Sequence, residues 1–323
     1  MAAAESCDST AELLIPSIPD EGEAGAHRHE LDQSSLIREA WSGLEVSPGV
    51  VSAGWLTLEI DEEEIAFLKI DPSGWLESNG ELIKESRIGR VFRIAGSNAD
   101  PGKYYVKERR YRTGYELLVQ RLRVSGLRRA CRLADHLLRN GISTPASRGF
   151  ITVRGGIETR EYLFKQSVPG GESLHDFLAN EYPLLDANEQ RLFRGLLSEE
   201  LAEMIAGLHR AGCENRDLKA TNLILANPIE NLRERGIVDL FLIDLEGVRR
   251  LGFIPRFRRE RDITRLHLSL LMRAEFHHAD RARFLTRYQT HFGESGWKRA
   301  WRRLTRSTER RLVAASKSGK TIH

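Results

Sequence analysis

The 323-residue chain contains little cysteine, and none in a pattern that would bind a metal. Its three cysteines, Cys7, Cys131 and Cys213, are odd in number and show neither CxxC nor metal-ligand spacing. We therefore expect reduced thiols rather than a disulfide framework. The sequence also lacks a run of about 18 apolar residues, and its N-terminus lacks a basic region followed by an apolar stretch. From these absences we expect no membrane span and no signal peptide, which favours a cytoplasmic enzyme.

The charge is unevenly distributed, although the formal net charge is only +3. Residues 1–80 hold 3 Lys and Arg against 17 Asp and Glu, whereas residues 249–323 hold 20 against 6. A basic C-terminal region is compatible with nucleic acid, anionic lipid or a phosphorylated substrate as partner. The positive charge of this region favours an anionic partner but does not identify which one.

The hydrophobic pattern predicts an N-terminal part without a core, followed by a strand-rich part. Residues 1–30 mix small, acidic and turn-forming residues without periodicity, which predicts a disordered acidic leader. Residues 31–80 form a predicted extension, in which Trp55–Ile70 is expected to be a strand pair that ends in a turn at Asp71–Gly74. Residues 81–168 form a predicted lobe with a helix from about Ser125 to Asn140, closed by Gly141. Its strands are expected at Arg90–Ala95, Tyr104–Glu108, Phe150–Val153 and Glu161–Gln166.

After Pro169 the pattern changes from strands to helices. Gln190–Arg210 carries leucines at helical spacing, so one face of this helix is expected to be buried. Two short apolar runs, Leu223–Leu225 and Leu240–Ile243, are followed by basic helices. Residues 169–312 are therefore interpreted as a helical lobe and residues 313–323 as a flexible tail. The order predicts an α+β protein with a strand-rich N-lobe and a helical C-lobe.

The most informative segment is Asn215–Leu223, which reads Asn-Arg-Asp-Leu-Lys-Ala-Thr-Asn-Leu. From Arg216 onward it fits the kinase catalytic loop H-R-D-L-x-x-x-N, with Asn215 in the position of the histidine. In such a loop the aspartate reaches the attacking hydroxyl, and the asparagine five residues later turns back towards a metal. The segment predicts a phosphotransferase in which Asp217 is the catalytic base.

Two further residues complete the predicted phosphate site. Asp244 follows the apolar run Leu240–Ile243, and a carboxylate at the end of a buried strand is costly unless a cation pairs with it. A Mg²⁺ ion that bridges ATP phosphates would be such a cation, so Asn222 and Asp244 are the predicted metal-binding pair. Lys107, on a predicted strand, supplies an ammonium group for the α- and β-phosphates of ATP, as the lysine of V-A-I-K does.

The sequence resembles the lipopolysaccharide kinase (Kdo/WaaP) family, a branch of the protein-kinase-like fold whose members phosphorylate sugars of the lipopolysaccharide core. The resemblance covers roughly residues 80–312. It is carried by five motifs, Tyr-Tyr-Val-Lys107, Gly141-Ile-Ser-Thr-Pro145, Leu208-His-Arg-Ala-Gly212, Arg216-Asp-Leu-Lys-Ala-Thr-Asn222 and Ile243-Asp-Leu245.

The resemblance implies a bilobal protein-kinase-like fold and a role for each matching residue. Asp217 would be the base, and Lys219 would neutralise charge on the transferring phosphoryl group. ATP would be bound by Lys107, Gly89, Asn222 and Asp244, of which the last two hold Mg²⁺. Gly89 lies in the segment Arg87–Phe92, which occupies the place of the glycine-rich loop. In addition, Asp262 is expected to accept hydrogen bonds from the catalytic loop.

The resemblance also implies the partners. We expect ATP and a sugar or glycolipid acceptor, the latter acidic, and no nucleic acid. The location is expected to be cytoplasmic, with the inner face of the cytoplasmic membrane as a peripheral alternative, through contact of the C-terminal arginines with anionic lipid. Seven arginines that follow Asp244 either coat the surface or bind the acidic acceptor: Arg249, Arg250, Arg256, Arg258, Arg259, Arg261 and Arg265.

Several departures from the kinase pattern leave alternatives open. Gly89 is the only glycine of its loop, Asp244-Leu-Glu-Gly247 replaces D-F-G, and no A-P-E segment follows. The predicted helix at 125–140 contains no glutamate that could pair with Lys107, so either Glu116 substitutes or the pair is absent. A compact protein Ser/Thr kinase and a nucleotide-binding pseudokinase therefore remain alternatives to the glycolipid kinase.

Overall fold

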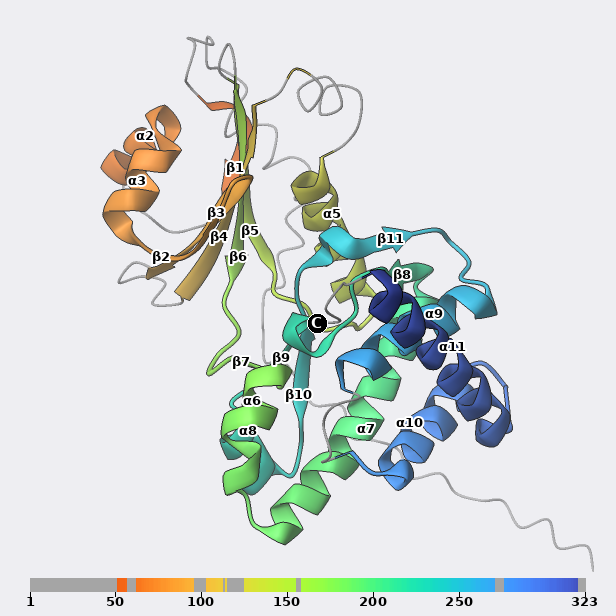
Figure 1. Ribbon diagram of the computed structural model, residues 1–323. Helices are drawn as coiled ribbons and strands as arrows, with labels where there is room; N and C mark the ends of the chain where they lie inside the picture. The colour runs from red at the N-terminus through yellow and green to blue at the C-terminus, as the bar shows by residue number, and fades with distance from the viewer. Residues whose placement is uncertain are drawn as a thin grey trace, which may run out of the picture.

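The computed structural model describes residues 51–56, 62–95, 103–112, 114, 125–154, 158–270 and 276–318. The predicted succession of a strand-rich lobe and a helical lobe is confirmed (Figure 1). The elements of the first lobe are β1 (Val51–Leu56), α2 (Glu62–Ile70), α3 (Pro72–Asn79), β2 (Gly80–Ser86), β3 (Gly89–Ala95), β4 (Lys103–Tyr111), α5 (Gly126–Arg139), β5 (Ser147–Arg154) and β6 (Thr159–Gln166).

The second lobe is mainly helical, with short strands near its boundary with the first. Its elements are β7 (Glu172–Ser173), α6 (Leu174–Asn180), α7 (Ala187–Arg210), β8 (Cys213–Asn215), β9 (Leu223–Ala226), α8 (Pro228–Glu230), β10 (Asp239–Leu242), β11 (Val248–Arg250), α9 (Arg256–Ser269), α10 (His278–Thr290) and α11 (Trp297–Ser318).

The first lobe is built on an antiparallel sheet of six strands in the order β1-β5-β6-β4-β3-β2. Helices cover both faces, α2 and α3 on one and α5 on the other (Figure 1). Because successive side chains of a strand point to opposite faces, β6 contributes to two cores. Tyr162 and Phe164 pack with the α2–α3 side, whereas Leu163 belongs to the core that α5 shares with the second lobe. This division leaves Lys107 of β4 on the α5 side.

One predicted strand pair is wrong. Of Trp55–Ile70, only the first residues belong to a strand, β1, while residues 62–70 form helix α2. The turn expected at Asp71–Gly74 is the start of helix α3, where the Asp71 side chain accepts a hydrogen bond from the Gly74 amide at 3.0 Å. The predicted leader over residues 1–30 lies outside the described residues, as do residues 31–50 and 57–61 of the predicted extension.

The second lobe places the Asn215–Leu223 segment between two small sheets. Strand β8 pairs with β11, and β9 pairs with both β10 and β7. Helix α7 leads into this region and begins with a capping box, in which Asp186 accepts from the Glu189 amide and Glu189 accepts from the Asp186 amide. The segment is therefore anchored at both ends by strands.

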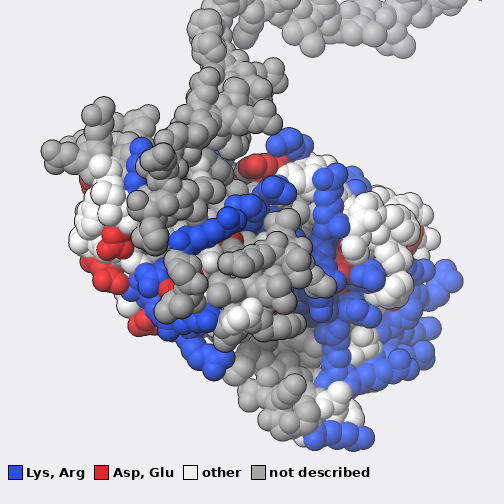
Figure 2. Space-filling view, turned by 90° about the horizontal axis from the view of Figure 1, so that it is seen from above, with Lys and Arg blue, Asp and Glu red and all other residues white. Residues whose placement is uncertain are grey.

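The surface charge differs between the two lobes. Seen from above, basic side chains gather over the helical lobe, while acidic and basic side chains alternate over the strand-rich lobe (Figure 2). Cys131 and Cys213 are buried free thiols, as expected, and Cys7 lies outside the described residues. Within the described part of the chain, no helix combines the length and apolarity needed to cross a bilayer.

Candidate active site between the lobes

A cavity of about 640 Å³ lies where the two lobes meet. Strands β2, β3, β4 and β6 line it from the first lobe, and η2 (Ala220–Asn222) with the segment after β10 line it from the second. Four of the predicted site residues lie in its wall, namely Gly89, Lys107, Asn222 and Asp244. Asp217 and Lys219 are not in the wall but lie beside it, in contact with Asn222 or with each other.

Lys107 reaches across the cavity from the first lobe to two carboxylates of the second. Its Nζ lies 3.1 Å from Asp244 Oδ1 and also forms an ion pair with Glu246 Oε1. Burial alone would lower the pKa of this ammonium group, but the charges of Asp244 and Glu246 outweigh burial and raise it. Lys107 therefore stays cationic.

The backbone at Asp244 is held in an uncommon conformation. Its φ of 53° and ψ of 62° lie in the left-handed region, which non-glycine residues seldom adopt. The preceding amide, of Ile243, donates to the Asn222 carbonyl oxygen at 3.0 Å, which ties this segment to the end of the catalytic loop. Such strain persists only where the surroundings impose it, and it is frequent at functional sites.

Within the catalytic loop, three side chains converge on Asp217. Asn222 Nδ2 donates to the Asp217 carbonyl oxygen at 2.8 Å and to its Oδ2 at 3.0 Å. Lys219 Nζ lies 3.0 Å from the same Oδ2. Asn215, in the place of the expected histidine, accepts the Asp217 amide hydrogen with its Oδ1 at 2.9 Å. The Asp217 side chain itself is 49% exposed, so a substrate hydroxyl can approach it.

Gly247 brings the segment after β10 against the catalytic loop. A Cβ at this position would lie 3.0 Å from Asp217 Cβ and 3.3 Å from the Asp217 amide nitrogen. The Gly247 carbonyl oxygen in turn accepts from the Arg216 amide at 3.0 Å. The displaced glycine of Asp244-Leu-Glu-Gly247 is thus explained by close packing, because a larger residue would push Asp217 away from the site.

Asp262, in the middle of helix α9, accepts a hydrogen bond from the catalytic loop, as expected from the resemblance. Its Oδ2 accepts from the Asn215 amide at 2.7 Å, and its Oδ1 pairs with Arg265 at 2.7 Å. His209, which is fully buried, contacts Asp262 at 3.4 Å and Tyr288 Oη at 2.8 Å. Burial lowers the pKa of His209 despite the nearby carboxylate. This histidine therefore has a structural role, as a buried contact of Asp262 and Tyr288.

Gly89 is required by strand packing. Residues 87 and 88 form the turn between β2 and β3, and Gly89 is the first residue of β3. A Cβ there would overlap the carbonyl oxygen of Glu108 on β4. Gly89 lines the cavity, but its own requirement for glycine comes from this close approach.

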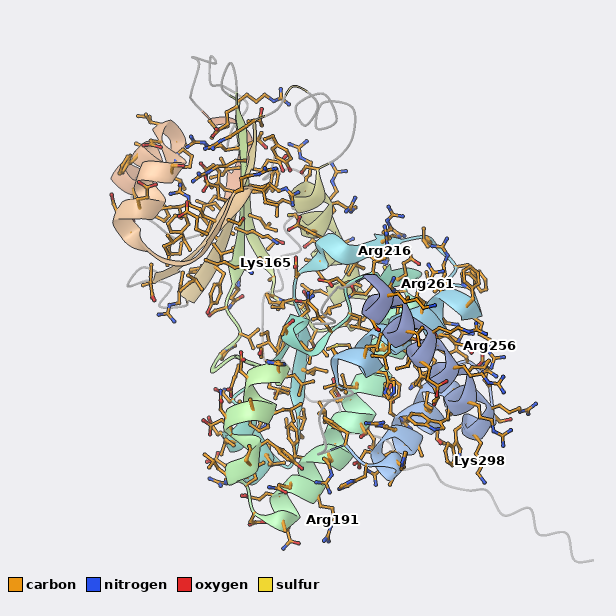
Figure 3. All side chains as sticks on the ribbon, viewed as in Figure 1. Lys165, Arg191, Arg216, Arg256, Arg261 and Lys298 are labelled. Carbon is orange, nitrogen blue, oxygen red and sulfur yellow. The ribbon has the colours of Figure 1, made fainter. Side chains whose placement is uncertain are left out.

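Two cavity residues were missed by the sequence analysis. Glu246 takes the place of the glutamate that helix α5 lacks, and α5 contributes instead by holding its backbone, since Arg129 donates to the Glu246 carbonyl oxygen at 3.0 Å. The other is Lys165 on β6 (Figure 3). Burial lowers its pKa to about 8, although Asp244 raises it in part. The proposed substitute Glu116 lies outside the described residues.

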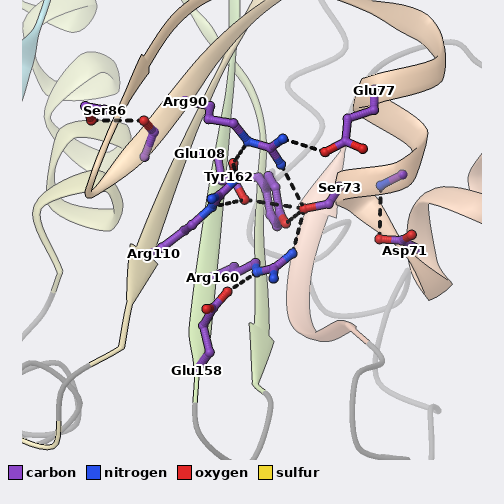
Figure 4. Close-up of polar contacts among 12 residues, drawn as sticks. Asp71, Ser73, Glu77, Ser86, Arg90, Glu108, Arg110, Glu158, Arg160 and Tyr162 are labelled. Atoms are coloured by element: carbon purple, nitrogen blue, oxygen red, sulfur yellow. Dashed lines mark hydrogen bonds and ion pairs between the residues drawn. The ribbon is translucent and has the colours of Figure 1, made fainter.

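A polar network fixes the far face of β4, directly behind Lys107 (Figure 4). Glu108 is fully buried and accepts from Arg90 and Arg110, while Ser73 of α3 bonds Tyr162 at 2.8 Å. Burial would raise the pKa of Glu108, but the hydrogen bonds from Arg110 and Arg90 lower it. Helix α3 is thereby attached to the strand that carries Lys107.

The donor atoms at the cavity fit a magnesium ion. Asn222 uses its Nδ2 for Asp217, and among the described residues its Oδ1 makes no hydrogen bond. This amide oxygen and the Asp244 carboxylate are hard oxygen ligands at one cavity. Mg²⁺ in kinases is commonly bound by one or two such protein groups, with phosphates and water completing the octahedron.

Arg216, the residue before Asp217, belongs to a cluster of four arginines with Arg261, Arg265 and Arg311. Figure 3 shows Arg216 near β11 and Arg261 on the helical lobe close by. Burial and the like charges of its neighbours lower the pKa of both Arg265 and Arg311. Only Arg265 forms an ion pair, with Asp262, within the described ranges. Cations held together in this way favour binding of an anion.

Comparison with solved structures found chains of similar fold. The solved structure entitled "WaaP in complex with acyl carrier protein" matches with a TM-score of 0.56 and 22% identity, over 80% of this chain and 97% of that one. The BubR1 kinase domain matches with a TM-score of 0.39 and 16% identity, over 70% of this chain and 59% of that one. A search of curated proteins finds no match.

The family comparison is more specific. The family model described as "Lipopolysaccharide kinase (Kdo/WaaP) family" matches residues 73–288, about two thirds of the chain. The bilobal kinase-like fold expected from the sequence is confirmed by the WaaP structure. The chain therefore belongs to the lipopolysaccharide kinase (Kdo/WaaP) family and is a kinase, a phosphotransferase with an alcohol group as acceptor.

Proposed function

We propose that the protein transfers the γ-phosphate of ATP to a hydroxyl group of a lipopolysaccharide core sugar or a related glycolipid. The observation that carries the proposal is the approach of Lys107 to Asp244, 3.1 Å apart although 137 residues separate them in the sequence. The same cavity contains Asn222, which is hydrogen-bonded to Asp217. This arrangement supports roles for Lys107 in binding phosphate, for Asn222 and Asp244 in binding a metal, and for Asp217 as the base.

In the proposed reaction Asp217 orients the acceptor hydroxyl and takes its proton on a carboxylate oxygen. The hydroxyl oxygen bonds to the γ-phosphorus while the bond from that phosphorus to the β–γ bridging oxygen breaks, which releases ADP. Lys107 binds the α- and β-phosphates, and Lys219, beside Asp217, offsets negative charge on the transferred group. Bound Mg²⁺, held by Asn222 and Asp244, would neutralise phosphate charge.

We further propose that the acceptor is acidic. The support is the arginine cluster Arg216, Arg261, Arg265 and Arg311, which includes the residue next to Asp217 and does not line the cavity assigned to ATP. Guanidinium groups bind phosphate and carboxylate groups in a bidentate manner. Because ATP is the phosphate donor, the proposal places the protein in the cytoplasm.

Glu246 bears on the pseudokinase alternative. That alternative rested on the lack of a glutamate partner for Lys107, and Glu246 supplies such a partner. The missing residue on α5 therefore no longer argues against catalysis.

The test is incubation with radiolabelled ATP and a panel of acceptors, with Asp244→Asn as the inactive control. The panel contains dephosphorylated lipopolysaccharide core, other envelope glycolipids and a protein extract. Label in a glycolipid, absent with Asp244→Asn, is the expected result. Label in protein alone would identify a compact protein kinase instead, and ATP binding without transfer to any acceptor would identify a pseudokinase.

A further inference from the structure

An apolar tip projects from the helical lobe beside the catalytic loop. Between β11 and the first turn of α9, three large apolar side chains face solvent, with Phe253 78% exposed, Phe257 59% and Leu251 46%. We call residues 251–257 the apolar tip. Three such side chains within seven residues are unusual on a protein surface, where exposed apolar residues are normally scattered.

The exposure does not come from a loose segment, because the apolar tip is attached at several points. The Leu251 amide donates to the Gly212 carbonyl oxygen at 2.7 Å, and the Ile254 side chain is buried. Just beyond the tip, Arg258 binds Glu214 of β8 at 2.9 and 3.0 Å. The fold therefore buries Ile254 and turns the neighbouring Phe253 outward.

The apolar tip is surrounded by positive charge. No acidic residue occurs between Glu246 and Glu260, whereas this stretch holds five arginines, Arg249, Arg250, Arg256, Arg258 and Arg259. Within the ranges that the structure describes, Arg249 and Arg250 form no ion pair. Arg261 and Arg258 lie over the Phe257 ring, 5.9 and 5.7 Å from its centre. Figure 2 shows basic side chains crowded over this lobe, and Figure 3 shows Arg256 and Arg261 projecting from it.

We propose that the apolar tip docks on a bilayer surface that contains anionic lipids. Phe253, Phe257 and Leu251 would insert among the acyl chains near the headgroups, and Arg249 and Arg250 would bind lipid phosphates. This combination of an apolar insertion and surrounding cations is what interfacial membrane binding requires. The phosphates of a nucleic acid or the carboxylates of an acidic protein would satisfy the charges, but three protruding apolar side chains fit an acyl layer best.

Docking in this way would set the catalytic loop close to the lipid surface. Strand β11, which leads into the apolar tip, pairs with β8, and β8 leads directly into the catalytic loop. The proposal concerns binding alone and stands apart from the proposed reaction, because it is tested without nucleotide or acceptor.

The experiment measures cosedimentation of the full-length protein with vesicles of phosphatidylcholine, with or without phosphatidylglycerol. The protein is expected to bind only the vesicles that contain phosphatidylglycerol. The double variant Phe253→Ser, Phe257→Ser should lower the partition coefficient at least about tenfold, because the acyl contacts are lost. The control Leu184→Ser removes a side chain that is 76% exposed between α6 and α7, outside the apolar tip, and should change nothing.

A second pair of variants tests the charges. Arg249→Gln with Arg250→Gln should weaken binding by about fivefold for each arginine removed, whereas Arg191→Gln, on the distant end of α7 (Figure 3), should not. Circular dichroism spectra and thermal melts should be the same in all variants, which shows that they fold. The proposal is overturned by absence of vesicle binding, by equal loss in the controls, or by binding that is independent of phosphatidylglycerol. It is also overturned if the two phenylalanines are needed instead for self-association or for binding an acidic protein.

Discussion

Replacement of Glu246 by Gln should weaken ATP binding while leaving the fold intact. The carboxylate of Glu246 binds Lys107 and, through Oε2, the Nη1 atom of Arg109 at 2.7 Å. Glutamine keeps the size of the side chain but removes its charge. Lys107 then retains only Asp244 as a partner, and this pairing draws the carboxylate that we propose as a metal ligand towards the lysine and away from the position that a metal would need.

The magnitude follows from the exposure of the groups. The Lys107 and Arg109 side chains are 38% and 33% exposed, so each ion pair is screened by water and contributes about 0.5–1 kcal/mol. Loss of both pairs should lower the free energy of unfolding by about 1–2 kcal/mol. For binding, misplacement of Lys107 and Asp244 should raise the Kd for Mg-ATP about five- to tenfold, since about 1.4 kcal/mol corresponds to a factor of ten.

Calorimetric titration with a non-hydrolysable ATP analogue and Mg²⁺ would measure this effect. Arg109→Gln is the matched control, because it removes one partner of Glu246 and leaves the Lys107 pair in place. We expect this control to lose stability but to keep the affinity of the unmodified protein within about twofold. Unchanged affinity in Glu246→Gln, or an equal loss in Arg109→Gln, would refute the assignment of Glu246 as the partner that positions Lys107.

Three further substitutions test the surroundings of the cavity. Gly89→Ala should lower the free energy of unfolding by about 1–3 kcal/mol, because the added Cβ overlaps β4. The control Gly195→Ala, in helix α7, adds a Cβ with no contact closer than 3.5 Å and should raise stability. Equal melting temperatures of the two variants would contradict the packing argument. In the unmodified protein the free energy of unfolding should rise as the pH increases from about 8 towards the ordinary lysine range, because the unfolded chain binds a proton there that Lys165 of the folded chain has released. Lys165→Met should remove this rise. Chemical denaturation at a series of pH values would contradict the reasoning if the unfolding free energy of the variant depended on pH as strongly as that of the unmodified protein. Asp262→Asn should lower stability by about 3 kcal/mol because Arg265 loses its buried partner, and a denaturant midpoint like that of the original protein would be incompatible with a supporting role.

Several strands and helices were predictable from the hydrophobic pattern and the capping residues of the sequence. The β4 segment was predicted as a strand at Tyr104–Glu108, and in the structure Tyr104 and Val106 are buried while Lys107 faces the cavity. The helix at 126–139 was equally clear, because Ser125 caps its start and Gly141, with φ of 73°, follows its end. In these elements local preference and tertiary packing agree.

The helices α2 and α3 were not predicted because their local pattern is ambiguous. Apolar residues between Trp55 and Ile70 fit a strand pair as well as a helix, and packing against the sheet selects the helix, burying Leu68 completely. Asp71 and Gly74 resemble a turn in sequence, yet the same Asp side chain caps a helix. Short apolar runs leave this choice to contacts that lie far away in the chain.

At the site, the catalytic loop was predictable because its function depends on a fixed spacing within one segment. The partner of Lys107 was not, since Glu246 reaches it only through the folding of two lobes onto each other. The displaced glycine at position 247 was the available signal, because it leaves Glu246 in the place that D-F-G gives to the glycine. Lys165 gave no signal, because a lysine at the end of a strand is commonly solvated.

The central claim is that Asp217 acts on the acceptor and the Lys107–Asp244 side of the cavity acts on ATP. The most direct test compares Asp217→Ala with the unmodified protein in two measurements on the same preparation, phosphoryl transfer from ATP to the glycolipid acceptor and the Kd for Mg-ATP. The account predicts that transfer falls by a factor of about 10²–10⁴ while the Kd stays the same. Transfer at the original rate, with the Asp217 carboxylate gone, would contradict it.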